Sequence, residues 1–169
     1  YNDMMELTEN MVAYVAKEVL GTTKIKYGDN EIDLTPPWDR KTMIGAIEEY
    51  TGKDFMTCSN LEEAVKMAQT IGVNVEECDS WGKVIDAVFE EKVEPSLIQP
   101  VHIIDYPLEI SPLAKVHREN TRLTERFETR VNGWEIANAF SELTDPIDQR
   151  ARFESQALAK ANGDEEAME

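Results

Sequence analysis

Residues 126–143 read RFETRVNGWEIANAFSEL, and this stretch decides the fold that the sequence predicts. Two runs with strand-like alternation flank Asn132 and Gly133, and an Asn-Gly pair between such runs is the strongest short-range hairpin signal. With these two as the turn residues, Arg130 lies opposite Glu135. The sequence therefore predicts two antiparallel strands joined by a tight turn.

The predicted hairpin places two carboxylates on one face. In this register Glu128 lies opposite Ala137, so Glu128, Arg130 and Glu135 project to the same side. Glu128 and Glu135 are then diagonal neighbours, with Cβ atoms roughly 7–8 Å apart. Carboxylates at this spacing can share Mg²⁺ with nucleotide phosphates. The alternative is a solvated acidic face in which Arg130 is the counter-charge and no metal binds.

Several runs along the chain carry a family resemblance. LTERFE at residues 123–128 and WEIANAFSELTDP at residues 134–146 together resemble the signature of class II lysyl-tRNA synthetases. The same family is resembled, in the same order, by YNDMMELTE (1–9), LIQP (97–100) and ISPLAK (110–115). The resemblance covers the whole chain. Its Asn-x-Phe-x-Glu-Leu block separates the lysine enzymes from the aspartate and asparagine members.

The resemblance implies a site for three small ligands. Glu128 and Glu135 match the carboxylates that hold ATP and Mg²⁺ in the family. Asn138, Phe140 and Glu142 match its lysine-pocket residues, with Glu142 placed to meet the ammonium group of L-lysine. The parent enzyme would form lysyl-adenylate from lysine and ATP, transfer lysine to tRNA(Lys), and act as a homodimer.

Strand geometry sets a condition on this assignment. Asn138 is three residues from Glu135, so strict alternation would place the two on opposite faces. A bulge between Ile136 and Ala139 would bring both to one face, and we predict one there. Trp134 departs from the family, which usually has a basic residue at that position.

Other motifs of the family are missing from the chain. We find neither its strand-loop-strand motif, whose Arg grips ATP, nor its Gly-rich strand with a second Arg, nor its anticodon-binding barrel. Adenylate formation depends on positioning and on stabilising phosphate charge. We therefore expect a fragment between the second and third class II motifs that is inactive alone. The alternatives are a non-catalytic synthetase-derived interaction module and a paralogue that attaches lysine to a protein.

Composition limits the possible partners. The 34 acidic and 17 basic residues give a net charge of −17, which opposes binding to a polyanion. Any tRNA contact of the parent is expected elsewhere, or on a local patch at residues 115–118. Cys58 and Cys78 form no metal spacing or disulfide framework, and His102 and His117 are too isolated to predict zinc. Without a signal peptide or a long apolar run, the chain is predicted to be cytoplasmic and not membrane-bound.

Strands and helices in separate blocks predict an α+β fold, with a partial antiparallel class II sheet, flanking helices and a small helical insertion. Residues 1–35 are expected to form a helix and a hairpin, residues 36–95 the insertion of three short helices, and residues 96–169 the signature strands and a closing helix. That helix should start at 144–146 and end near 162–163, before a frayed acidic tail. In the first helix, an apolar stripe at helical spacing is expected to pack in the core. The stripe consists of Met4, Leu7, Met11, Val15 and Val19.

Overall fold

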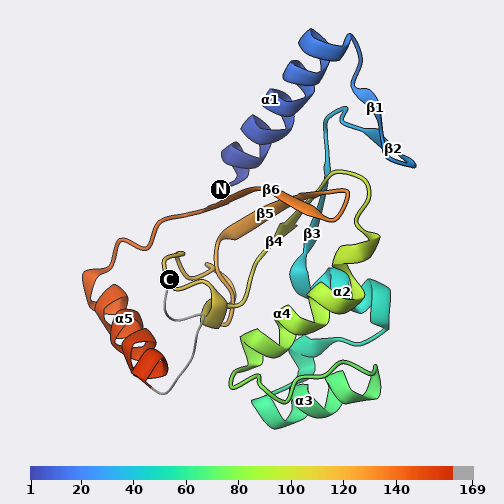
Figure 1. The fold of residues 1–169 in the computed structure, drawn as a ribbon. Helices are drawn as coiled ribbons and strands as arrows, with labels where there is room; N and C mark the ends of the chain where they lie inside the picture. Colours follow the sequence, from blue (N-terminus) through green and yellow to red (C-terminus); the bar gives the residue numbers. More distant parts are fainter. Residues whose placement is uncertain (162–169) are drawn as a thin grey trace.

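The computed structural model describes residues 1–161 and has an α+β fold (Figure 1). Its elements, in chain order, are α1 Asn2–Leu20, β1 Lys24–Tyr27, β2 Asn30–Asp33, β3 Asp39–Thr42, α2 Met43–Thr51, η1 Phe55–Thr57, α3 Leu61–Thr70, α4 Trp81–Lys92, η2 Glu94–Ser96, β4 Val101–Ile104, η3 Leu108–Ile110, β5 Arg126–Val131, β6 Trp134–Phe140 and α5 Pro146–Ala161. The predicted end of the last helix and the acidic tail lie outside the described residues.

The main sheet is mixed, so the predicted antiparallel sheet is wrong in one respect. Its strand order is β3-β4-β5-β6; β4 and β6 run antiparallel to β5, but β3 runs parallel to β4. Helices α2 to α4 join these two parallel strands, as a parallel pair requires a long crossover. β3 was not predicted because its four residues, Asp-Arg-Lys-Thr, are all polar and show no strand alternation.

Several local predictions are confirmed. β1 and β2 form the expected hairpin as a separate two-stranded sheet, and the three short helices are α2, α3 and α4. The Ser80 hydroxyl caps α4 by accepting from Lys83 N–H. Asn60 caps α3 by accepting from Glu63 N–H, and the Glu63 carboxylate accepts from Ser59 N–H.

The core lies between one face of the main sheet and the helical layer. Val101 and Ile103 of β4 are buried in one apolar cluster with residues of α2, α3 and α4, the helices that lie below the sheet in Figure 1. The opposite face of the sheet carries His102 and Thr129, both fully buried, and receives α1. Glu9 of α1 approaches this face, with its Oε2 3.4 Å from His102 Nε2.

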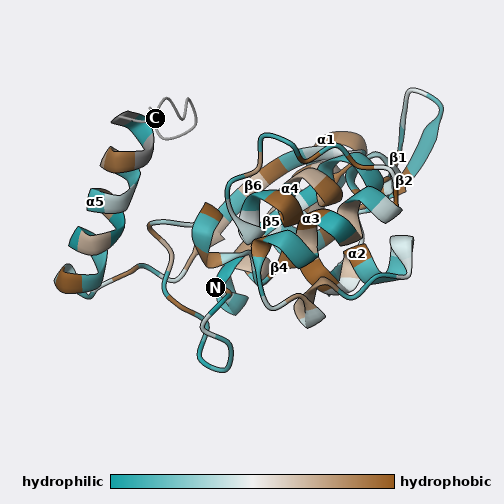
Figure 2. Ribbon diagram, turned by 90° about the horizontal axis from the view of Figure 1, so that it is seen from below, coloured by the Kyte–Doolittle hydropathy of each residue, from teal (hydrophilic) through white to brown (hydrophobic). Residues whose placement is uncertain are grey.

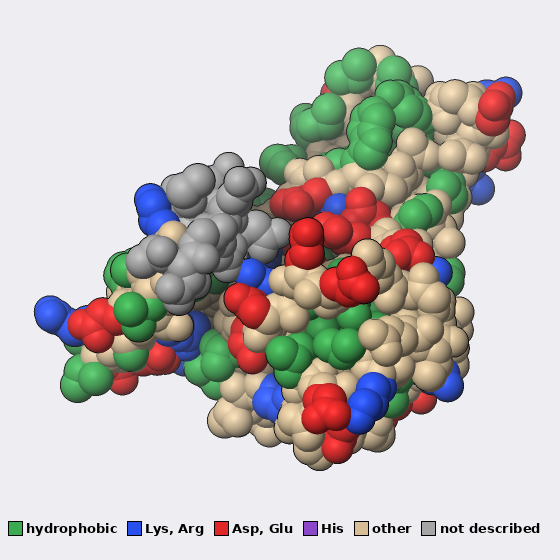
Figure 3. Space-filling model, turned by 60° about the horizontal axis from the view of Figure 1, so that its bottom comes forward, with side chains coloured by type: hydrophobic (Ala, Val, Ile, Leu, Met, Phe, Trp, Pro, Cys, Tyr) green, Lys and Arg blue, Asp and Glu red, His purple; other side chains and the backbone are tan. Residues whose placement is uncertain are grey.

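The predicted core stripe of α1 is exposed, so that prediction is wrong. Its five residues are 46–73% exposed, whereas the buried positions of α1 are Met5, Thr8, Glu9, Ala13 and Ala16. These buried positions form a narrow strip beside the predicted stripe, and Glu9 of this strip approaches His102 of β4. Apolar side chains consequently gather on the surface of the lobe that α1 forms (Figure 3).

Helix α5 stands apart from the rest of the molecule (Figure 2). It begins at Pro146 as predicted, with Asp145 Oδ1 accepting from Ile147 N–H at 2.8 Å. Arg152 ties α5 to the loop before β5 by donating to the Ala114 carbonyl at 2.8 Å. Over the described residues, no helix is long and apolar enough to cross a membrane.

Candidate functional site

The predicted hairpin exists as β5 and β6. Asn132 and Gly133 have φ values of 55° and 75°, as a type I′ turn requires. Arg130 lies opposite Glu135, as expected. The sequence therefore correctly predicted the turn type and the pairing of the residues next to the turn.

Further from the turn, the register differs by one residue from the predicted one. The pairing shifts between Thr129 and Arg130, and Ile136 is left without a partner. Glu128 therefore lies opposite Asn138, and the predicted pairing of Glu128 with Ala137 is wrong. The irregularity falls at Ile136, which is the amino-terminal edge of the span where a bulge was predicted.

The bulge resolves the conflict over which face the site residues occupy. Opposed residues share a face, so Glu135 joins Arg130 and Asn138 joins Glu128 on the same side of the hairpin. Phe140, paired with Arg126, lies on that side too. We call this side the carboxylate face. Its residues are Arg126, Glu128, Arg130, Glu135, Asn138 and Phe140.

Glu128 is the anchor of the carboxylate face. Only 5% of the residue is exposed, and its two oxygens accept from Arg126 Nη2 and Arg130 Nη2, each at 2.6 Å. Asn138 Nδ2 donates to the same carboxylate at 3.4 Å, and Arg126 Nε donates to Asn138 Oδ1 at 3.3 Å. Two guanidinium groups thus fix one buried carboxylate and orient the neighbouring amide.

Glu135 is more open than Glu128. Its side chain is 40% exposed, and its Oε2 lies 3.9 Å from Arg130 Nη2. Arg130 also bonds Glu94 at 3.1 Å, and burial raises the pKa of Glu94 despite this partner. Arg130 therefore lies among three carboxylates, two from the hairpin and one from η2.

A polar hollow of about 370 Å³ opens onto this face. Its lining includes Glu128, Arg130 and Glu135 from the hairpin, Glu90 from α4, and Tyr106. The Tyr106 hydroxyl and Arg130 Nε are buried and lack a hydrogen-bond partner among the described residues. Burial, reinforced by the nearby Glu128 carboxylate, raises the pKa of Tyr106 well above its usual value.

The donor set fits a magnesium ion that is shared with phosphates. Glu128 and Glu135 present carboxylate oxygens on one face, and one or two carboxylates are enough when phosphates complete the coordination. Unpartnered buried donors beside them favour an anionic ligand. Within residues 1–161, no cluster of three His, Cys, Asp or Glu is arranged as a metal centre. The hairpin therefore supplies two carboxylates for a metal ion, and water or phosphate oxygens would complete the coordination.

The lysine-pocket residues are only partly brought together. Asn138 touches Glu128, and Phe140 is half-buried on the same face. Glu142 lies beyond the end of β6, where it bridges to Ala114, and its side chain is exposed. The three predicted lysine-pocket residues thus follow one another along β6 and the segment after it. Glu142 is the one furthest along the chain from the position opposite Glu128.

Sequence reasoning missed three contributors to the site. Arg126 repeats the two-residue spacing of Arg130 and Glu128, so the Arg-x-Glu-x-Arg pattern of β5 could have revealed it. Glu94 and Tyr106 come from distant segments and left no such signal. Their place in the site follows from the packing of η2 and the loop after β4 on the hairpin.

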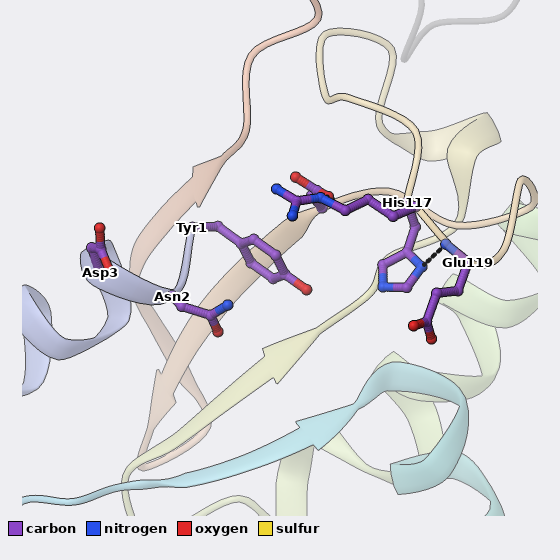
Figure 4. Close-up of a pocket in the computed structure, with 7 residues that line it drawn as sticks. Tyr1, Asn2, Asp3, His117 and Glu119 are labelled. Atoms are coloured by element: carbon purple, nitrogen blue, oxygen red, sulfur yellow. Dashed lines mark hydrogen bonds and ion pairs between the residues drawn. The ribbon is translucent and has the colours of Figure 1, made fainter.

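A second polar hollow of about 340 Å³ lies at the start of α1 (Figure 4). The Tyr1 hydroxyl donates to Asp105 Oδ1 at 3.0 Å, and burial raises the pKa of Tyr1 above its usual range. His117 Nδ1 accepts from Glu119 N–H at 3.2 Å, and Arg118 bonds the buried Glu125. None of the predicted site residues lines this hollow.

Comparison with protein families defines the class of the chain. The chain belongs to the class II tRNA synthetases of the D, K and N group, whose family model matches residues 1–169. The α+β fold with its mixed sheet is consistent with this membership.

Individual relatives narrow the comparison. The chain is 55% identical to the lysine–tRNA ligase of Trichormus variabilis over 169 residues, which are 99% of this chain and 30% of the relative. It is 56% identical to that of Nostoc punctiforme over 169 residues, again 99% of the chain and 30% of the relative. The ligase of Carboxydothermus hydrogenoformans is 54% identical over 167 residues, 99% of the chain and 34% of the relative. The chain spans about a third of the length of these relatives.

Proposed function

We propose that this chain is part of the catalytic domain of a lysine–tRNA ligase, and that its carboxylate face contributes to the sites for ATP, Mg²⁺ and L-lysine. The single observation that carries the proposal is the bulge at Ile136. It puts Glu135 and Asn138 on the face of Glu128, as one shared site demands. The relatives support the choice of lysine, because the three described above are named as lysine–tRNA ligases.

Each side chain has a distinct task in this proposal. Glu128 and Glu135 would hold the metal, which supplies charge neutralisation to the ATP phosphates when bound. Asn138 is oriented by Arg126 and would align the substrate, while Phe140 would pack the aliphatic stem of lysine. Glu142 would pair with the lysine ammonium group and so select a cationic amino acid.

The whole ligase would form lysyl-adenylate and transfer lysine to tRNA(Lys). A cytoplasmic location and a homodimer are expected of that whole enzyme. Residues 1–169 include neither of the family's two motifs whose arginines bind the ATP phosphates. We therefore expect no lysine-dependent ATP–pyrophosphate exchange from this segment alone. An interaction module would show neither exchange nor lysine binding, and a protein-lysylating paralogue would bind lysine but not act on tRNA.

Calorimetric titration of L-lysine into the chain tests the pocket. We expect saturable binding that Glu142→Gln weakens at least about ten-fold, because a charge-assisted hydrogen bond is replaced by a neutral one. Glu62→Gln on the exposed side of α3 is the matched control and should leave the affinity unchanged. Equal affinity for L-lysine and L-norleucine, or an unaffected Glu142→Gln variant, would contradict the assignment of Glu142.

A further inference from the structure

Arg130 occupies an unusual position at the centre of the candidate site. Its Nη1 lies 3.1 Å from Glu94 Oε2, and its Nη2 lies 2.6 Å from Glu128 Oε2 and 3.9 Å from Glu135 Oε2. The side chain is only 13% exposed. The guanidinium group therefore sits where a cation shared by Glu128 and Glu135 would sit.

We propose that Arg130 is a displaceable counter-ion of the metal site. Without metal it occupies the cation position between Glu128 and Glu135, and it withdraws towards Glu94 when a divalent cation binds there. This inference rests on the proposed function in one respect, namely that Glu128 and Glu135 are the metal carboxylates. It assigns to Arg130 the control of when that pair accepts a metal.

The two arginines bound to Glu128 differ in how they are held. Arg126 is fixed by neutral groups, because it donates to the Ile110 carbonyl and the Ser111 hydroxyl, each at 3.0 Å. Its guanidinium also lies 4.7 Å above the Tyr106 ring. Every ion pair or hydrogen bond described for the side chain of Arg130 ends instead on a carboxylate. Arg126 is thus a fixed part of the site, whereas Arg130 is held by charge alone.

This difference makes the exchange physically reasonable. Glu128 uses Oε1 for Arg126 and Oε2 for Arg130, so it stays anchored through Oε1 when Oε2 is released to a metal. A divalent cation at the pair would repel the adjacent guanidinium. Glu94 already bonds Nη1 and offers a partner on the side away from Glu135. Arg130 can therefore leave the pair without becoming an unpaired buried charge.

The test is a titration of Mn²⁺ into the chain without nucleotide, with free Mn²⁺ measured by electron paramagnetic resonance. Mn²⁺ stands in for Mg²⁺ because both prefer oxygen ligands. In Arg130→Met the competitor is gone and the two acids repel each other, so we expect Mn²⁺ to bind on the order of ten-fold more tightly. Arg150→Met on exposed α5 changes the net charge equally and should leave the affinity unchanged.

Two further variants keep the test decisive. Arg130→Lys retains the charge but cannot bridge Glu94 and Glu128 with a planar fork, so its affinity should fall between wild type and Arg130→Met. It also serves if the Met variant fails to fold, which circular dichroism would reveal. Adding Glu135→Gln to Arg130→Met should abolish the gain, because the metal then loses one of its two carboxylates.

The possible outcomes distinguish failure of the Arg130 inference from failure of the proposed metal site. If wild type binds Mn²⁺ and the Arg130 variants bind it equally or more weakly, Arg130 is a fixed support and the inference is wrong, while the metal site stands. If no variant binds Mn²⁺, the inference and the assigned metal carboxylates are both wrong. A gain that persists with Glu135→Gln would place the ion elsewhere and also overturn the inference.

Discussion

Replacing the buried His102 by Phe should remove a pH dependence of stability. His102 is fully buried, with its ring 5.5 Å from both Trp38 and Phe127, so an aromatic ring without nitrogens fits the same space. Burial lowers the pKa of the imidazole, and the Glu9 carboxylate opposes this only in part. The folded state therefore favours the neutral ring.

The direction and the magnitude of this pH dependence follow from the difference between the His102 pKa values of the folded and unfolded states. Below the unfolded His pKa of about 6.5, the unfolded chain binds the proton more readily than the folded chain, so stability falls as pH falls. The loss from this residue can reach about 1.4 kcal/mol for each pH unit below that value. Glu9 on α1 and Arg40 on β3 are the charged groups that influence the ring, and Arg40 lowers its pKa further.

Urea unfolding of the wild type and of His102→Phe, from pH 8 to pH 5, checks this prediction. At pH 8 the variant should lose about 1–3 kcal/mol, because the 2.8 Å bond to the Thr129 hydroxyl and the Glu9 contact disappear. Its stability should then depend less on pH than that of the wild type below pH 6.5. Glu9→Gln should steepen the dependence, because it removes the carboxylate that favours the charged ring. Parallel profiles for His102→Phe and wild type would refute the reasoning.

Four further substitutions test the packing and the local signals by urea unfolding. Phe127→Ala, at a fully buried position, should cost about 3–5 kcal/mol, whereas Phe153→Ala, at a 47% exposed position of α5, should change stability by less than about 0.5 kcal/mol; equal effects would contradict the described core. Gly133→Ala should cost about 1 kcal/mol or more because φ is +75° at this turn position, and a neutral result would argue against the type I′ turn. Asn60→Ala should cost about 1 kcal/mol by removing the cap of α3, and an unchanged midpoint would mean that another group satisfies Glu63 N–H.

The hairpin shows how far local signals reach. The Asn132-Gly133 turn, the pairing of Arg130 with Glu135 and the need for a bulge all follow from residues close together in the sequence. The bulge falls at Ile136, not deeper in the predicted span, and the pairing of Glu128 moves to Asn138. A single extra residue changes every later pairing of the strand, so the far register depends on packing that local patterns do not encode.

Helix α1 is a case in which a correct local prediction gave the wrong tertiary contacts. Its apolar periodicity correctly predicts a helix, and Gly21 directly after it has the left-handed conformation typical of a helix end. The same periodicity predicts the wrong buried face, because the buried residues of α1 include Glu9 and Ala13 and none of the stripe. Periodicity indicates that a helix has an apolar stripe, but only its neighbours decide which part of the surface is covered.

The sequence by itself determined the main helices, the two hairpins, and the pairing of Arg130 with Glu135, since these depend on backbone preferences and contacts a few residues apart. Only the tertiary structure decided that the polar β3 joins the sheet in parallel and that Glu94 and Tyr106 close around Arg130. Those features bring together segments separated by 24 residues or more. The free energy of such long-range contacts comes from the completed packing, which no local pattern of residues records.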